Sequence, residues 1–252
     1  MGTVRYFELT SLDISNLERL YYDIVSFLKD KTKDLAVLKV YNMENHLSEH
    51  ISFMDELNEK EAKKYISIGQ TLFTAIYNAK KIILAVADGY IFDGFFEILL
   101  ACDLFFSTKR SKFGFPCINY GIIPAFGSLK LLCRGIFEQF VKYMVLTGAM
   151  INAEDLYNKG IINKLFEDSK DCQKDVDILN KNFSSKSKFA LGLAKESINH
   201  TLFASLEDAL LIEQNAFCLS FSNDDRVEGI RAFLEKRPPN FKSRWEDIYN
   251  SL

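Results

Sequence analysis

The sequence predicts an α/β fold with one main core, followed by a helical region. Apolar, β-branched segments typical of buried strands alternate with segments of helical periodicity in the first part of the chain. This alternation indicates a parallel sheet joined by crossover helices. From about residue 138 onward, helical patterns dominate. The chain has 252 residues and is 48% hydrophobic, which is enough to bury a core of this size.

The predicted core elements come from local patterns. The expected strands are residues 5–10, 35–41, 82–87 and 104–107. Ser15-Asn16-Leu17-Glu18 matches a capping box, which predicts that the first helix begins there. Two further helices are expected over residues 62–79 and 94–102, whereas residues 42–61 are polar and are expected to be irregular.

The C-terminal part is expected to be helical. The predicted helices cover residues 138–146, 153–159, 187–199, 206–220 and 225–235, and Pro238-Pro239 ends the last one. We therefore divide the chain into an α/β core, residues 1–185, and a helical C-terminal region, residues 186–252.

Composition excludes several classes of protein. The 31 basic and 34 acidic residues nearly cancel, so no basic stripe indicates a nucleic-acid partner. The apolar stretches are too short to span a membrane, and the N-terminus has no signal-like apolar segment. The five cysteines are scattered and form no C-x-x-C, which argues against disulfides and structural zinc. We expect a cytoplasmic protein.

The segment around Gly94 is the best candidate for chemistry. A buried strand ends near Gly89, and a helix begins near Gly94. The first N–H groups of a helix are free and lie at the positive end of its dipole. A carbonyl oxygen placed there gains hydrogen bonds that strengthen as negative charge develops on it. The alternative is a glycine turn that only joins strand to helix.

Four motifs occur in order in this chain. They are KIILAVADGYIFDGFFEILLACDL (81–104), KFGFPCINYGIIPAFG (112–127), LTGAMINAEDLYNKGIIN (146–163) and EGIRAFLEKRPPNFK (228–242). Together they resemble the signatures of the crotonase (enoyl-CoA hydratase/isomerase) superfamily, and the chain is identified as a divergent member.

The resemblance implies a crotonase-like ββα spiral with a helical C-terminal trimerisation region, assembled as homotrimers or hexamers. It implies an oxyanion hole made by the N–H of Gly94 and a second N–H from a loop, which family spacing assigns to Ile51. Glu97 matches an acid/base glutamate. Phe233 and Lys236 match residues that contact coenzyme A from a neighbouring subunit, although a core Phe and a solvated Lys are the alternatives.

Three departures from the family pattern matter. The second family glutamate is replaced by Cys117, and a thiol with an ordinary pKa of about 8.5 is a poor substitute. Asp93 stands in the usual glycine triplet, either as an extra catalytic acid or as a solvated or capping residue. The N-terminal stretch that holds the CoA adenine is absent, so an acyl carrier protein with a phosphopantetheine arm is an alternative thioester carrier.

The function expected from the resemblance is an enzyme of enoyl-CoA hydratase/isomerase type, a lyase or an isomerase. It would act on an acyl thioester through an enolate and need no cofactor beyond that carrier. Two alternatives stay open. One is a decarboxylase of a malonyl- or glutaconyl-like thioester, and the other is a non-catalytic paralogue.

A second motif points to different chemistry. His46-Leu47-Ser48-Glu49-His50 spells H-x-x-E-H, which binds zinc in some proteases when it lies on a helix. The segment falls where a loop is expected, so we expect no metal site. His50 is expected near the acyl pocket, either in an acid/base role or as a surface histidine.

Overall fold

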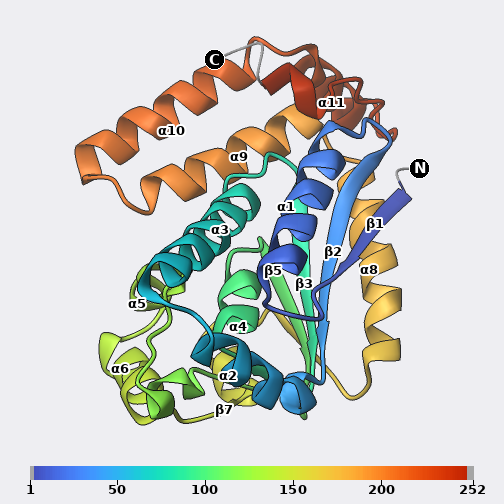
Figure 1. Cartoon of the computed structure of the whole chain (residues 1–252). Helices are drawn as coiled ribbons and strands as arrows, with labels where there is room; N and C mark the ends of the chain where they lie inside the picture. Colours follow the sequence, from blue (N-terminus) through green and yellow to red (C-terminus); the bar gives the residue numbers. More distant parts are fainter. Residues whose placement is uncertain (1–2, 249–252) are drawn as a thin grey trace.

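The computed structural model describes residues 3–248 and has a mixed α/β architecture (Figure 1). The larger sheet is parallel and has the order β1-β2-β3-β5-β8. Its strands are β1 (Thr3–Glu8), β2 (Lys33–Tyr41), β3 (Ile82–Asp88), β5 (Leu104–Thr108) and β8 (Lys164–Phe166). The predicted α/β class and parallel sheet are confirmed.

A second, smaller sheet lies beside the first. Its strands are β4 (Tyr90–Phe92), β6 (Lys112–Gly114) and β7 (Ile151–Asn152). β4 pairs in parallel with β6, and β6 pairs antiparallel with β7. These strands have two or three residues each, too short for an alternation pattern to reveal them in the sequence.

Helices cover the faces of the larger sheet and continue beyond it at the C-terminal end of the chain. They are α1 (Ile14–Lys29), α2 (Leu47–Asp55), α3 (Glu59–Tyr77), α4 (Asp93–Leu100), α5 (Ser128–Gly135), α6 (Glu138–Thr147), α7 (Ala153–Asn158), α8 (Ser169–Ser184), α9 (Lys188–Thr201), α10 (Leu206–Ser220) and α11 (Asp224–Leu234). Three 3₁₀ turns complete the set: η1 (Met43–His46), η2 (Pro116–Tyr120) and η3 (Trp245–Ile248).

Alternate side chains of the central strands enter two separate cores. In β2, Ala36 and Leu38 join a large cluster with residues of α1, α3 and α4, whereas Leu35 and Val37 join a cluster with residues of α8 and α9. Successive side chains of a strand point to opposite faces, so both faces of the sheet are buried. Figure 1 shows α8 on one face and α1 and α3 on the other.

Two N-terminal expectations were wrong in detail. α1 begins at Ile14 because the carboxylate of Asp13 accepts the N–H of Asn16 at 2.9 Å, so Asp13 is the cap and Ser15 is not. Residues 42–61 are not irregular, since they contain η1, α2 and the start of α3. α3 begins with a capping box between Asn58 and Glu61.

The C-terminal helices leave the sheets. α9 packs on α10, and both extend beyond the sheets in Figure 1. α10, described in full, buries none of its side chains. α9 is tied to the core by Lys195, whose Nζ donates to the Asp103 carboxylate at 2.8 Å and to the Lys81 carbonyl at 3.0 Å. The proposed boundary at residue 185 falls between α8 and α9 and stays a prediction.

Within the described part of the chain, none of the helices qualifies as a membrane span.

Candidate functional site

The site is built where β3 gives way to α4. β3 ends at Asp88, whose buried carboxylate accepts Arg110 Nε at 2.7 Å and Nη2 at 2.6 Å, and Thr108 Oγ1 at 2.7 Å. Gly89 follows with a positive φ of 91°. After β4, α4 begins at Asp93 with φ 46°, a left-handed conformation that is uncommon outside glycine. The chain thus turns sharply to present the first turn of α4.

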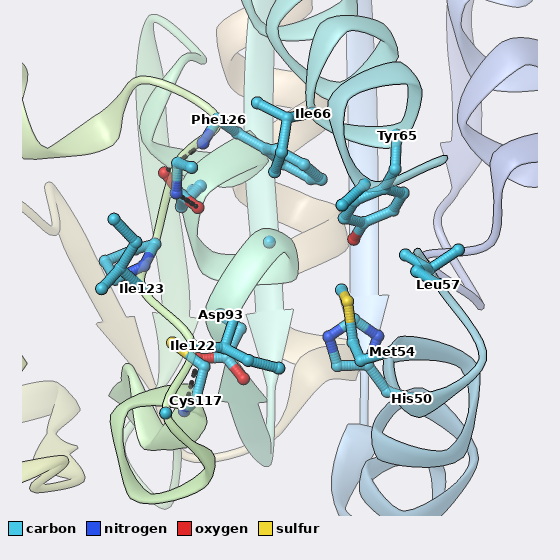
Figure 2. Close-up of a pocket in the computed structure, with 16 residues that line it drawn as sticks. His50, Met54, Leu57, Tyr65, Ile66, Asp93, Cys117, Ile122, Ile123 and Phe126 are labelled. Carbon is cyan, nitrogen blue, oxygen red and sulfur yellow. Dashed lines mark hydrogen bonds between the residues drawn. The ribbon is translucent and has the colours of Figure 1, made fainter. Parts of the chain in front are cut away.

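The N-terminus of α4 opens on a cavity of about 440 Å³ (Figure 2). Residues of α2, α3, α4, η2 and the 121–126 segment line it. Its wall is mainly apolar and includes Met54, Leu57, Ile66, Ile122 and Ile123. Among the described residues lining it, none is Lys or Arg, and the carboxyl groups are Asp93 and Glu97.

Gly94 lies in the wall of this cavity. It is the second residue of α4, so its N–H has no acceptor within the helix. A Cβ at this position would lie 2.6 Å from Cε2 of Phe126 and 3.1 Å from Cδ1 of Leu12. Only glycine fits without moving that aromatic ring. The location of Gly94 suits the predicted oxyanion hole, while its contact with a substrate stays a prediction.

Glu97 also lies in the wall, but its carboxylate already has many donors. It is 2% exposed and accepts the backbone N–H groups of Ala125, Phe126, Gly127 and Ser128 at 2.9–3.3 Å. The hydroxyl of Ser128 donates to it at 2.8 Å. Burial raises the pKa of Glu97, and these hydrogen bonds oppose the rise. Glu97 therefore caps the N-terminus of α5, a role that sequence reasoning missed.

Asp93 is the second carboxyl group of the cavity. It is 5% exposed, and its Oδ1 accepts the N–H of Cys117 at 3.1 Å. Burial raises its pKa to about 6, hydrogen bonds with Cys117 lower it, and the nearby charge of Glu97 adds to the rise. Figure 2 shows the Asp93 side chain on the cavity side facing His50. Because Asp93 is buried and α4 has no side-chain cap, the solvated or capping alternative is wrong.

Cys117 itself is buried in the cavity wall. Burial and the charge of Asp93 raise the pKa of its thiol far above the ordinary value. The thiol stays protonated at neutral pH, so the geometry gives no support for a nucleophilic cysteine.

His50 belongs to the cavity, and Ile51 does not. His50 is half-buried, lines the wall and lies with its ring 5.9 Å from that of Phe92, so the surface alternative is wrong. Burial lowers the pKa of His50 to about 4. Ile51 is the fifth residue of α2, where an N–H donates to the first carbonyl of the helix. The structure does not bring Ile51 to the described lining of the cavity, and its assignment as the second oxyanion donor stays a prediction.

The H-x-x-E-H segment forms an ordinary surface pair. Nδ1 of His46 lies 3.1 Å from Oε2 of Glu49. Among residues 3–248, no three His, Cys, Asp or Glu side chains are grouped so that they could hold a metal ion.

Phe233 and Lys236 lie at the C-terminal end of α11, away from the cavity lining. Phe233 is 82% exposed, so the core alternative for it is wrong, and Lys236 is exposed. The structure does not bring them to the cavity of their own chain. Their predicted contact with coenzyme A at a neighbouring subunit stays a prediction.

Comparisons with known proteins agree with one another. The family model described as enoyl-CoA hydratase/isomerase matches residues 37–244. The crotonyl-CoA hydratase of Syntrophomonas wolfei is 32% identical over 194 residues, 77% of this chain and 74% of that protein. The short-chain-enoyl-CoA hydratase of Clostridium acetobutylicum is 29% identical over 239 residues, 94% of this chain and 91% of that protein.

Solved structures show the same fold. An enoyl-CoA hydratase from Bacillus anthracis superposes with a TM-score of 0.86 at 22% identity, covering 96% of each chain. A second one, from Geobacillus kaustophilus, superposes with a TM-score of 0.84 at 22% identity, covering 95% of this chain and 93% of that chain.

Proposed function

The chain belongs to the enoyl-CoA hydratase/isomerase family, within the crotonase superfamily, and from that membership we propose that it is an enzyme acting on an enoyl-CoA thioester. Relatives named as hydratases of crotonyl-CoA and short-chain enoyl-CoA support a CoA carrier over a carrier protein. The reaction we propose is hydration or double-bond isomerisation through a thioester enolate.

The observation that carries this proposal is the free N–H of Gly94 at the wall of a largely apolar cavity. A thioester oxygen bound there would accept that hydrogen bond at the positive end of α4. The bond strengthens as negative charge moves onto the oxygen, and the apolar surroundings strengthen it further. Ile51, the predicted second donor, lies within α2 and outside the described cavity lining, so this proposal is built on Gly94 alone.

The charges of the cavity favour an uncharged acyl chain. Its two carboxyl groups have no Lys or Arg beside them among the described lining residues, and His50 is neutral at pH 7. A malonyl-like acyl group would bring a further carboxylate close to Asp93 and Glu97. Burying like charges together is unfavourable, so the decarboxylase is the weaker alternative.

Turnover assays separate the candidate reactions. The protein is mixed with crotonyl-CoA, with 3-butenoyl-CoA and, separately, with malonyl-CoA, and the products are followed by absorbance and mass. We expect crotonyl-CoA to lose its conjugated double bond or 3-butenoyl-CoA to gain one. Malonyl-CoA should stay intact. Carbon dioxide release from malonyl-CoA, or no turnover of either enoyl thioester, would contradict the proposal.

A further inference from the structure

Asp93 and Glu97 are four residues apart at the start of α4, so both carboxyl groups project from one face of the helix into one cavity. The hydrogen bonds around the two carboxyl groups differ, and this difference indicates which group can exchange a proton with a substrate. The inference rests on the proposed function, because it concerns the same cavity.

Glu97 is held by its donors. One of its oxygens accepts the N–H of Ala125, and the other accepts three N–H groups and the Ser128 hydroxyl. Protonating this carboxylate would break several charge-assisted hydrogen bonds at once. The same bonds hold residues 125–128 in place and keep the Phe126 ring against Gly94. Glu97 is therefore suited to positioning.

Asp93 is held by fewer contacts. Its hydrogen bond at 3.1 Å comes from the backbone N–H of Cys117, the residue that stands where the family has its second glutamate. The Asp93 carboxylate, which α4 supplies, therefore lies beside the position in η2 where Cys117 replaces a glutamate. Figure 2 shows this side chain reaching into the cavity opposite His50 and Met54.

The backbone at Asp93 adopts an uncommon conformation. Its φ of 46° lies in the left-handed region, which Asp and Asn enter more readily than most side chains but still less readily than glycine. A buried carboxyl group is a second unfavourable feature. Strain of this kind persists mainly at functional sites.

We propose that Asp93 is the catalytic acid/base of this cavity and that Glu97 is a positioning residue. The Asp93 carboxylate takes a proton from the substrate Cα, the C–H bond breaks, and its electron pair forms the enolate whose oxygen is held by the Gly94 N–H. The carboxylic acid then returns the proton, either to Cα or, for a 3-enoyl thioester, to Cγ. No oxidant, reductant or co-reactant is needed.

The titratable groups around Asp93 come from α2, α3, α4 and η2. His50 on α2 is neutral above about pH 4 and Tyr65 on α3 keeps its proton, because burial lowers the pKa of the first and raises that of the second. Cys117 on η2 stays protonated because burial raises the pKa of its thiol. Burial also raises the pKa of Glu97 on α4, and the hydrogen bonds to Glu97 oppose that rise. Exchange should therefore rise with pH around the Asp93 pKa of about 6.

Hydrogen–deuterium exchange at Cα tests this without knowledge of the natural product. Butyryl-CoA is incubated with protein in D₂O, and its mass is followed. Asp93→Asn keeps the shape, tolerates the left-handed backbone and can still accept the Cys117 N–H. We expect exchange to fall at least about a hundredfold in Asp93→Asn, with butyryl-CoA binding retained by calorimetry. Asp93→Gly, which relieves the backbone strain, should show the same loss of exchange as Asp93→Asn.

Two controls sharpen the result. Glu49→Gln removes an exposed carboxylate on α2 and should leave exchange unchanged. Glu97→Gln should slow exchange but keep a pH midpoint, because the titrating group is still present. The midpoint should move slightly downward, since the Glu97 charge that raises the Asp93 pKa is removed. Exchange by both Asp93 variants within about tenfold of the parent would overturn this inference alone. A parent protein that exchanges no deuterium would overturn the proposed function as well.

Discussion

At the scale of single residues, the two carboxylates of the cavity differ in how many hydrogen bonds they accept. Five hydrogen bonds reach Glu97, from four N–H groups and one hydroxyl. Asp93 is almost as buried, and its pKa rises to about 6. A buried group whose charged form is poorly compensated lowers stability, and such groups are kept where function needs them.

Asp93→Asn should stabilise the protein at neutral pH. The folded pKa of about 6 lies above the ordinary 3.8, so the folded state favours the protonated carboxyl. The stability contributed by this group is present below about pH 4 and is lost as pH rises through about 6. Replacement by a neutral amide should therefore raise the free energy of unfolding by about 3 kcal/mol near pH 7.5, and by less near pH 5, as measured by urea denaturation.

Asp13→Asn is the control, for which we expect the free energy of unfolding to change in the opposite direction. Burial acts to raise the Asp13 pKa, but hydrogen bonds from Ser11, Ser15 and Asn16 outweigh it and hold the pKa well below the usual range. Its charged form stabilises the fold at neutral pH, so this variant should be less stable than the parent. A loss of stability in both variants would contradict the argument for Asp93.

At the scale of elements, long-range capping organises the site. The N-cap of α5 is Gly127, which has no side-chain cap hydrogen bond, and Glu97 of α4 supplies the acceptor instead. α2 brings His50 and Met54 to the cavity through a helix that the polar sequence of residues 42–61 did not predict. Tertiary contacts around the cavity, rather than local helix propensity, determine that these helices form there.

The attachment of α9 gives a test at this scale. Lys195 and Asp103 form a buried ion pair at 2.8 Å. Lys195→Met would leave the Asp103 carboxylate buried without its cation, which typically lowers the free energy of unfolding by about 3–5 kcal/mol. Lys142→Met removes an exposed pair with Glu138 and should change stability by less than about 0.5 kcal/mol. Equal effects in urea denaturation would contradict the structural role of Lys195.

At the scale of the whole molecule, the C-terminal helices expose a broad apolar surface. The exposed apolar side chains of α10 and α11 are Leu206, Leu210, Leu211, Phe217, Val227, Ile230, Phe233 and Leu234. Exposed patches of this kind mark interaction surfaces. Together with the resemblance, they support the predicted homotrimer or hexamer, in which Phe233 and Lys236 would reach a neighbouring subunit.

Light scattering tests the assembly. We expect a particle mass of three or six times the chain mass of 29.0 kDa. Phe217→Asp combined with Leu210→Asp places charges on the apolar surface of α10 and should lower the particle mass while leaving the fold intact by circular dichroism. A parent protein that scatters as a single chain would contradict the prediction.

The sequence by itself determined the α/β class, the family and the position of Gly94 at a helix start. These follow from local patterns, since strand and helix periodicities and motif spacing are written in neighbouring residues. It also placed α10 at residues 206–220 as observed, because its boundaries carry a capping serine and a regular helical pattern.

Only the tertiary structure shows how the surroundings of the two carboxylates differ. The donors to Glu97 lie 28–31 residues later in the chain, and the N–H that meets Asp93 lies 24 residues later. No local pattern records such contacts, because they form only when α4, η2 and the start of α5 pack together. The helix α2 was missed for the same reason, since tertiary packing turned a polar segment that was expected to be irregular into a helix.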